Sequence, residues 1–238
     1  MKHTPIKAVY FDAGGTLLRV RGSVGEIYAA AAARQGFPVE TRSVQEAFRF
    51  AWARSLHRRK ENGWVSSDGF LRDEWRTIVA DCFDGLVPPE ASLRAFEELY
   101  EHFSGPEPWS IAPGALEFIA GLKARRVTVG ILSNWDHRLP ICLERLGIVK
   151  SFDHLVISYA VGVEKPHPRI FEEAARRCGA PAEATLMVGD TYEMDIAPAI
   201  QHGWRAAWLT QDPGTGDLPA GVEKVRDFRE LGERFQEE

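Results

Sequence analysis

Cysteine is scarce in this sequence of 238 residues, and the three cysteines that occur are scattered. Cys82, Cys142 and Cys178 form no CxxC pair and stand at none of the cysteine–histidine spacings typical of a zinc site. The sequence therefore indicates neither a zinc centre nor a disulfide framework. We expect the three thiols to serve as small apolar residues of the core.

Long apolar runs and an excess of positive charge are missing as well. No window approaches the roughly 18 to 20 apolar residues of a membrane span, and no apolar run precedes the first strand. The net charge of −5 and the pI of about 5.9 argue against nucleic-acid binding, which requires a basic face. We expect a cytoplasmic protein, monomeric or homodimeric, with neither a membrane nor a nucleic acid as partner.

The composition is that of an ordinary globular protein, 45% hydrophobic and 26% charged. The chain is organised around the segment IKAVYFDAGGT at residues 6–16. Apolar and β-branched residues at its start indicate a buried parallel strand, which runs directly into Asp12 and two glycines. An Asp-Gly-Gly run is also ordinary turn chemistry. In open α/β sheets, however, the carboxyl ends of the strands are where ligands bind.

After Thr16 the pattern becomes helical for about ninety residues, and we expect no strand in this block. Ser23 and Glu26 form a capping box before an alanine-rich helix that Gly36 closes. Further helices are expected near residues 44–59, 69–82 and 89–103. We therefore predict a helical cap domain over residues 19–107, inserted into a core domain of residues 1–18 and 108–238.

The second half alternates between strands and helices, which predicts an α/β fold with a Rossmann-like parallel sheet. A loop at residues 211–221 leads to a last helix that starts near Asp227. The expected strands are 127–132, 154–158, 184–188 and 205–209. The expected helices are 114–125, 137–146, 168–178 and 193–201.

Polar residues follow the first four core strands at the same edge of the expected sheet. Each has an ordinary explanation as a turn, cap or loop residue when it is taken alone. They are Asp12, the Ser133-Asn134 pair, Lys165, and Asp190 with Asp195.

Together these residues meet one physical demand. Asp12, Asp190 and Asp195 would crowd three carboxylates into one crevice, which is unfavourable unless a cation such as Mg²⁺ neutralises them. Because Mg²⁺ commonly binds carboxylates together with phosphate oxygens, the substrate is expected to be a small phosphorylated molecule. Ser133 and Lys165 would hold the phosphoryl oxygens, and Asp12 could attack phosphorus to form an aspartyl-phosphate.

At this point the chain resembles the haloacid dehalogenase-like hydrolase superfamily. The four motifs of that family are matched by FDAGGT around Asp12, ILSN around Ser133, EKPHPRIF with Lys165, and VGDTYEMD with Asp190 and Asp195. The resemblance implies a Rossmann-like core with a helical-bundle cap inserted after the first motif. It also implies that the backbone carbonyl of Gly14 joins the three carboxylates as a Mg²⁺ ligand. The residues expected to bind the substrate are Gly15, Thr16, Asn134 and Trp135.

Gly14 departs from the family's phosphatases, which have at this position an Asp that protonates the leaving group. A glycine supplies no proton, and general acid–base help is typically worth ~10²–10⁴-fold in rate. We therefore expect a phosphatase that is slow or selective for good leaving groups.

Three alternatives stay open. A 2-haloacid dehalogenase needs no proton donor and no metal, although both Asp190 and Asp195 are kept here and would repel the substrate carboxylate. Phosphonate-cleaving relatives use a cap lysine, and the cap has only Lys60, in an unsuitable context. A degenerate member could retain Mg²⁺ and phosphate binding as a regulatory module.

The expected cap is rich in arginine, and an arginine that faces the crevice would bind a second anionic group of the substrate. Most helical arginines are solvated, however, and the cap tryptophans at 52, 64 and 75 are expected either in the cap core or along a pocket. Arg19 and Arg21 lie near the expected hinge, His57 and His102 are possible proton carriers, and His167 is expected to be structural. The cap arginines considered for this role are Arg34, Arg42, Arg49, Arg54, Arg58, Arg59, Arg72 and Arg76.

Overall fold

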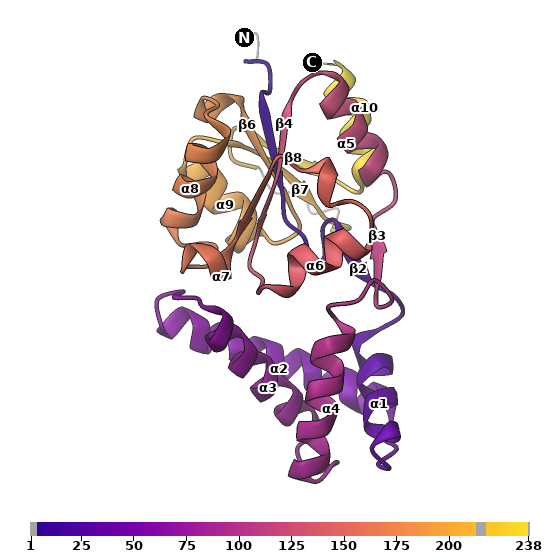
Figure 1. The fold of residues 1–238 in the computed structure, drawn as a ribbon. Coiled ribbons are helices and arrows are strands. Elements are labelled where there is room, and N and C mark those ends of the chain that lie inside the picture. The colour runs from indigo at the N-terminus through magenta and orange to yellow at the C-terminus, as the bar shows by residue number, and fades with distance from the viewer. Residues whose placement is uncertain (1–3, 213–217, 238) are drawn as a thin grey trace.

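The computed structural model describes residues 4–212 and 218–237. Its centre is a parallel sheet in the spatial order β5-β4-β1-β6-β7-β8 (Figure 1). The strands of this sheet are β1 (Ala8–Phe11), β4 (Thr128–Ser133), β5 (His154–Ile157), β6 (Thr185–Gly189), β7 (Arg205–Leu209) and β8 (Val222–Val225). The predicted α/β fold with a Rossmann-like sheet is confirmed.

Strand β1 lies in the middle of the sheet, with β4 on one side and β6 on the other. The chain passes from β1 to β4 and β5 on one side, and then crosses to β6, β7 and β8 on the other. This reversal makes the carboxyl end of β1 the topological switch point, where the connecting loops diverge and leave a crevice.

Alternate residues of β1 face opposite sides of the sheet, as the strand period requires. Tyr10 packs into the cluster under α8 and α9, and its hydroxyl donates to the Ala174 carbonyl at 2.7 Å. Val9 and Phe11 face the cluster under α5 and α10. The helices of the core are α5 (Ala115–Ala124), α6 (Arg138–Arg145), α7 (Ser158–Val161), α8 (Pro168–Cys178), α9 (Ala197–Gln201) and α10 (Phe228–Glu237).

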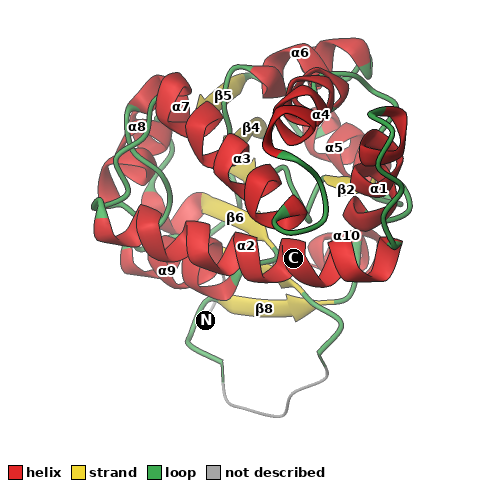
Figure 2. Ribbon diagram, turned by 90° about the horizontal axis from the view of Figure 1, so that it is seen from below, coloured by secondary structure: helices red, strands yellow, loops and turns green. Residues whose placement is uncertain are grey.

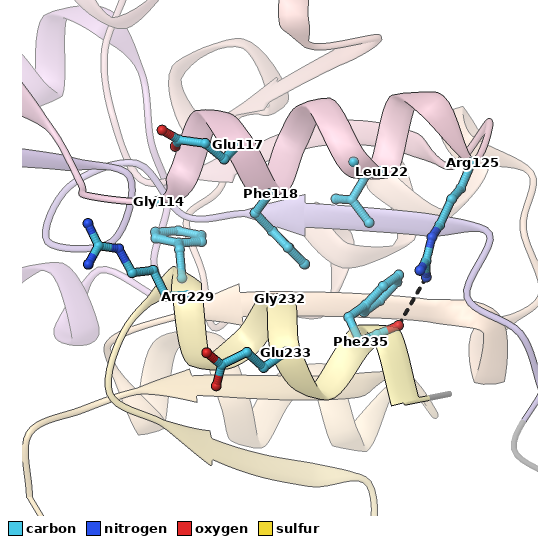
Figure 3. Close-up of a pocket in the computed structure, with 11 residues that line it drawn as sticks. Gly114, Glu117, Phe118, Leu122, Arg125, Arg229, Gly232, Glu233 and Phe235 are labelled. Carbon is cyan, nitrogen blue, oxygen red and sulfur yellow. Dashed lines mark hydrogen bonds between the residues drawn. The ribbon is translucent and has the colours of Figure 1, made fainter.

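Helices α5 and α10 run side by side around a hollow of about 300 Å³ (Figure 3). The rings of Phe118, Phe228 and Phe235 line it, and Arg125 donates to the Phe235 carbonyl at 3.0 Å. None of the predicted site residues lies in this hollow. It is part of the packing of the last helix onto the core.

The cap is a bundle of four helices that lies across the carboxyl edge of the sheet (Figures 1 and 2). They begin and end within three residues of the helices predicted from the sequence, and the capping box of Ser23 and Glu26 is formed. The bundle has an apolar core of its own, with Tyr28, Phe83 and Phe96 at its centre. The four helices are α1 (Val24–Arg34), α2 (Thr41–Glu61), α3 (Asp68–Phe83) and α4 (Pro89–His102).

The expectation of no strand directly after Thr16 was wrong. Strand β2 (Leu18–Val20) pairs with the antiparallel strand β3 (Trp109–Ile111), and the two form a ribbon where the cap joins the core. Three residues are too few for a period-two pattern, and the pairing partner lies some ninety residues away, so no local signal announces it. The expected domain limit at 18/19 falls inside β2.

Strand β8 was also missed, because three of its four residues are half-buried at the edge of the sheet and carry little apolar pattern. Residues 213–217 of the predicted loop at 211–221 lie outside the described residues. The described cysteines are free, two buried and one half-buried, as expected. Among the helices of residues 4–212 and 218–237, none is long and apolar enough to cross a bilayer.

Candidate active site

The predicted site residues that follow β1, β4 and β6 meet at the switch point. The Asp12 N–H donates to the Val188 carbonyl at 2.9 Å, which continues the ladder between β1 and β6 up to the carboxylate. Ser133 is the last residue of β4, and its hydroxyl donates to Asp12 Oδ1 at 3.1 Å. The sheet register thus brings together residues more than a hundred positions apart.

Lys165 is buried at the centre of this site. Its Nζ lies 2.7 Å from Asp12 Oδ1 and 2.6 Å from Asp195 Oδ1, and its side chain is only 2% exposed. Burial alone would lower the pKa of Lys165, but the two carboxylates outweigh burial and raise the pKa above its usual value. The lysine therefore carries a positive charge at neutral pH and binds two carboxylates at once.

Asn134 holds the backbone of Lys165 in place. The amide of Asn134 donates to the Lys165 carbonyl at 2.8 Å, and its oxygen accepts from the Lys165 N–H at 2.6 Å. Asn134 was predicted to bind substrate. In the structure its side chain positions the lysine, although the residue also lines the cavity described below.

Gly15 and Thr16, the other residues of the first motif predicted to bind substrate, contact Asp190. The Thr16 hydroxyl donates to Asp190 Oδ1 at 3.0 Å. Gly15 has φ +90°, and a Cβ there would lie 2.5 Å from Asp190 Oδ2, so the position requires glycine. These two residues fix the Asp190 carboxylate beside Asp12.

Asp195 reaches the site from a π-helical turn, Tyr192–Ile196, which begins three residues after β6. Its Oδ2 accepts from the Thr191 N–H at 3.0 Å. A Cβ on Gly189 would lie 2.4 Å from the Asp195 Cβ, so only glycine allows the turn to approach the strand this closely. π-Helical turns of this kind occur frequently at functional sites.

Asp12, Asp190 and Asp195 can each place one carboxylate oxygen within 4.8 Å of the others. Burial, together with repulsion from Asp12, raises the pKa of Asp190 and raises that of Asp195 to about 7. Lys165 supplies only one positive charge against three acidic groups. The arrangement suits a divalent cation, since carboxylate oxygens are hard ligands and the site has charge left to neutralise.

The family follows from comparison with known proteins. A model of the haloacid dehalogenase-like hydrolases matches residues 6–203, which include all four motifs. The chain belongs to the haloacid dehalogenase-like hydrolase family. The mouse protein named haloacid dehalogenase-like hydrolase domain-containing protein 3 is 36% identical over 193 residues, covering 80% of this chain and 76% of the mouse protein.

Solved structures of this family share the fold with the present hydrolase. A defluorinating L-2-haloacid dehalogenase superposes with a TM-score of 0.76 at 20% identity, over 97% of this chain and 95% of that one. A phosphatase of the same superfamily from Thermococcus onnurineus superposes with a TM-score of 0.67 at 23% identity, over 96% and 97%. Since both chemistries occur on this fold, the fold does not choose between them.

A cavity of about 540 Å³ opens from the carboxyl edge of the sheet toward the cap. Asp12, Gly14, Ser133, Lys165 and Asp195 line its core end. The cap and the hinge ribbon supply the opposite walls, which are mostly aromatic and aliphatic. These wall residues include Leu18, Val20, Tyr28, Phe48, Trp52, Leu56, Leu71, Trp75, Ile78, Phe103 and Trp109.

Trp135 borders the cavity directly beside the first motif, as predicted. Its backbone N–H donates to the Ser158 hydroxyl at 3.1 Å, and its ring lies 5.2 Å from that of Trp109. A Cβ built on Gly14 would lie 3.2 Å from Cζ3 of Trp135. The indole therefore occupies the space beside position 14. Whether the Gly14 carbonyl binds a metal stays a prediction.

Apart from Arg49, the cap arginines considered from the sequence do not offer a free positive charge. Arg59 lines the cavity but donates to both oxygens of Glu164 at 2.6 Å, and both side chains are buried. Arg49 is exposed, with no ion pair among the described residues. Six of the other cap arginines bind carboxylates: Arg34 with Glu98, Arg42 with Glu46, Arg54 with Asp81, Arg58 with Glu74, Arg72 with Glu97, and Arg76 with Asp73.

Other residues singled out in the sequence have structural surroundings. His167 is the N-cap of α8, where its Nδ1 accepts from the Arg169 N–H, in line with the structural role expected of it. His57, His102 and Trp64 do not line the cavity. No local pattern predicts the pairing of Arg59 with Glu164, because the two residues are 105 positions apart.

Proposed function

We propose that this hydrolase is a Mg²⁺-dependent phosphatase that acts on a small phosphorylated molecule through an aspartyl-phosphate at Asp12. The observation that carries the proposal is the set of three carboxylates around one lysine. Attack on a haloacid requires no metal, and two further acids beside the nucleophile would repel the substrate's own carboxylate. A phosphoryl group and a divalent cation account for all three acids.

The chain's own residues would perform the steps as follows. The Asp12 carboxylate attacks phosphorus, the bond from phosphorus to the leaving oxygen breaks, and that oxygen departs with the electron pair and takes a proton from water. Ser133 and Lys165 donate to the phosphoryl oxygens and stabilise their charge. A water then attacks phosphorus and loses a proton to solvent, the bond from phosphorus to Asp12 breaks, and inorganic phosphate leaves.

Mg²⁺ would be held by Asp12, Asp190 and Asp195, with the Gly14 carbonyl as a further expected ligand, and would neutralise charge on the carboxylates and phosphoryl oxygens. Lys165 would orient the Asp12 carboxylate through its contact with Oδ1. Because Gly14 provides no acid, the reaction depends on a leaving oxygen that departs without a proton from the protein.

The test is phosphate release from acetyl phosphate with Mg²⁺ and with EDTA, since this substrate needs little protonation of its leaving group. We expect release with Mg²⁺, and a loss of at least ~10⁴-fold in kcat on Asp12→Asn, because the amide is not a nucleophile. Asp73→Asn is a matched control, since Asp73 is an exposed cap residue paired with Arg76. Undiminished hydrolysis by Asp12→Asn would exclude Asp12 as the nucleophile.

One observation favours a second candidate, a metal-independent dehalogenase. A halide leaves without a proton, so the glycine at position 14 would cost that reaction nothing. Halide release from 2-chloropropionate in EDTA, together with no phosphate release from acetyl phosphate, would replace the phosphatase proposal by this one.

A further inference from the structure

We propose that the cavity receives the aromatic ring of an aryl phosphate monoester, so that the leaving group is a phenol. The inference rests on the proposed phosphatase function and names its substrate class. Two independent observations carry it: the chemistry of the walls opposite Asp12, and the residue that fills the space beside Gly14.

The cap side of the cavity presents a continuous aromatic wall. The rings of Phe48 and Trp52 are nearly parallel at 6.2 Å, and the ring of Trp75 follows at 5.7 Å from Trp52. Flat apolar surfaces of this kind bind aromatic rings by burial and by offset or edge-to-face contact. A sugar or a short polyol would leave its hydroxyl groups without partners against this wall.

Two buried arginines pack against the tryptophans of this wall, and each is already paired with a carboxylate. The Arg59 guanidinium, bound to Glu164, lies 5.6 Å from the centre of the Trp52 ring. The Arg138 guanidinium, bound by Asp136 at 2.6 Å, lies 5.8 Å from the centre of the Trp75 ring. Both pairs are therefore already neutralised, so neither cation is left to recognise a second anionic group deep in the cavity.

The remaining charged residues of the lining agree with this reading. Glu74 accepts from Arg58 at 2.9 Å and from Ser55 at 2.6 Å. Arg19 is exposed on β2, at the hinge, and forms no ion pair within the described part of the chain. Its place on the hinge ribbon suits attraction of the incoming phosphate, whereas the wall of the cap stays neutral and apolar.

The surroundings of Gly14 point to the same leaving group. No acid stands at this position, and the Trp135 ring occupies the space beside it. A phenol has a pKa near ~10, far below the ~16 of water and comparable hydroxyl groups, so a phenolate departs without a proton donor. A ring bonded to the leaving oxygen would also lie against the indole of Trp135.

Four substrates separate the effect of the ring from that of the leaving group. 2-Naphthyl phosphate has a ring and a phenolate leaving group, benzyl phosphate has a ring and an alkoxide, acetyl phosphate has a good leaving group without a ring, and glycerol 1-phosphate has neither. We expect kcat/KM to be highest for 2-naphthyl phosphate and lowest for glycerol 1-phosphate. Relative to acetyl phosphate, the ring should lower KM by about ten-fold or more.

Variants of one helix test where the ring binds. Trp52→Ala should lower the ratio of kcat/KM for 2-naphthyl phosphate to that for acetyl phosphate by about ten-fold, mainly through KM. Phe50→Ala is the matched control, because Phe50 lies on the same helix, is 68% exposed and does not line the cavity. Its ratio should equal that of the parent protein.

A binding measurement complements the kinetics. In calorimetric titration with Mg²⁺ present, phenylphosphonate should bind the parent protein at least about ten-fold more tightly than methylphosphonate. Hydrolysis of acetyl phosphate without any preference for the aryl substrate or ligand, or a preference for glycerol 1-phosphate, would overturn this inference and leave the phosphatase proposal standing. Failure to hydrolyse acetyl phosphate and 2-naphthyl phosphate alike would overturn both.

Discussion

The two ends of the cavity are built by different rules. At the core end, Asp12 and Ser133 lie at the ends of neighbouring strands and Lys165 lies on the loop after α7, and hydrogen bonds to Asp12 join the three residues. At the cap end, the walls are aromatic rings carried by helices. The core end would treat every substrate of one reaction type alike, whereas the aromatic walls would choose among them, because we expect the leaving group to lie against those walls.

The same comparison explains why residue types predicted the cluster of acids at the core end, but failed to predict the charge available at the cap end. Among the described residues, the acids of the core form ion pairs with no cation except Lys165, so their carboxylate charge is left for a ligand. Arginines of the cap form ion pairs with carboxylates on neighbouring helices and loops, and these ion pairs neutralise their positive charge.

The largest effect, on the stability of the protein, is expected at the Arg59–Glu164 ion pair, which joins the cap to the core. Arg59→Met leaves the Glu164 carboxylate buried and unpaired, which should destabilise the protein by about 3–5 kcal/mol. The midpoint of thermal unfolding should fall by roughly 10 °C. Arg42→Met, at an ion pair whose arginine is 83% exposed, should change it by less than about 2 °C.

A double variant separates charge from packing in that pair. Arg59→Met with Glu164→Met removes both charges, and most of the lost stability should return, because replacing a buried pair by apolar residues is often neutral. If the double variant were as unstable as Arg59→Met, packing of Arg59 on Trp52 within α2, rather than the ion pair with Glu164, would account for its contribution to stability.

A smaller effect is expected from restoring an acid at position 14, which would make the core end less dependent on the leaving group. Gly14→Asp alone should help little, because a side chain there meets Trp135. Gly14→Asp with Trp135→Ala should raise kcat for glycerol 1-phosphate relative to 2-naphthyl phosphate by about ten-fold, below the ~10²–10⁴-fold of a well-placed acid. Trp135→Ala alone is the control, and an equal ratio in the two variants would contradict the proposed reason for slow turnover.

The smallest effect concerns pH and Mg²⁺ at the core end. Burial raises the pKa of Asp195 to about 7 in the metal-free fold, above the value near 3.8 of an exposed Asp. The folded state therefore holds a proton that the unfolded chain releases, and this stabilisation is lost as pH rises from about 4 to 7. Mg²⁺ must displace that proton, so its stabilising effect should grow over the same range.

We expect saturating Mg²⁺ to raise the unfolding midpoint by roughly 5 °C more at pH 8 than at pH 5.5. Sodium chloride at matched ionic strength is the control, and Asp190→Asn should reduce the shift at both pH values. A shift that does not change with pH would mean that the metal does not compete with a proton in this site.

The sequence by itself determined the parallel sheet, the inserted helical block and the residues that meet at the end of β1. Strand periodicity, helix caps and strand-end polar residues are local patterns, and the carboxyl ends of parallel strands share one edge of the sheet. The helices of the cap were predictable to within a few residues for the same reason.

Only the tertiary structure decided the hinge ribbon, the pairing of Arg59 with Glu164 and the position of the Trp135 ring beside Gly14. Each of these features joins residues about ninety or more positions apart. No local pattern encodes such a pairing, since it depends on how the helices of the cap are docked onto the sheet. For the same reason, the motifs indicate the chemistry at Asp12, but only the docked cap forms the aromatic wall that faces it.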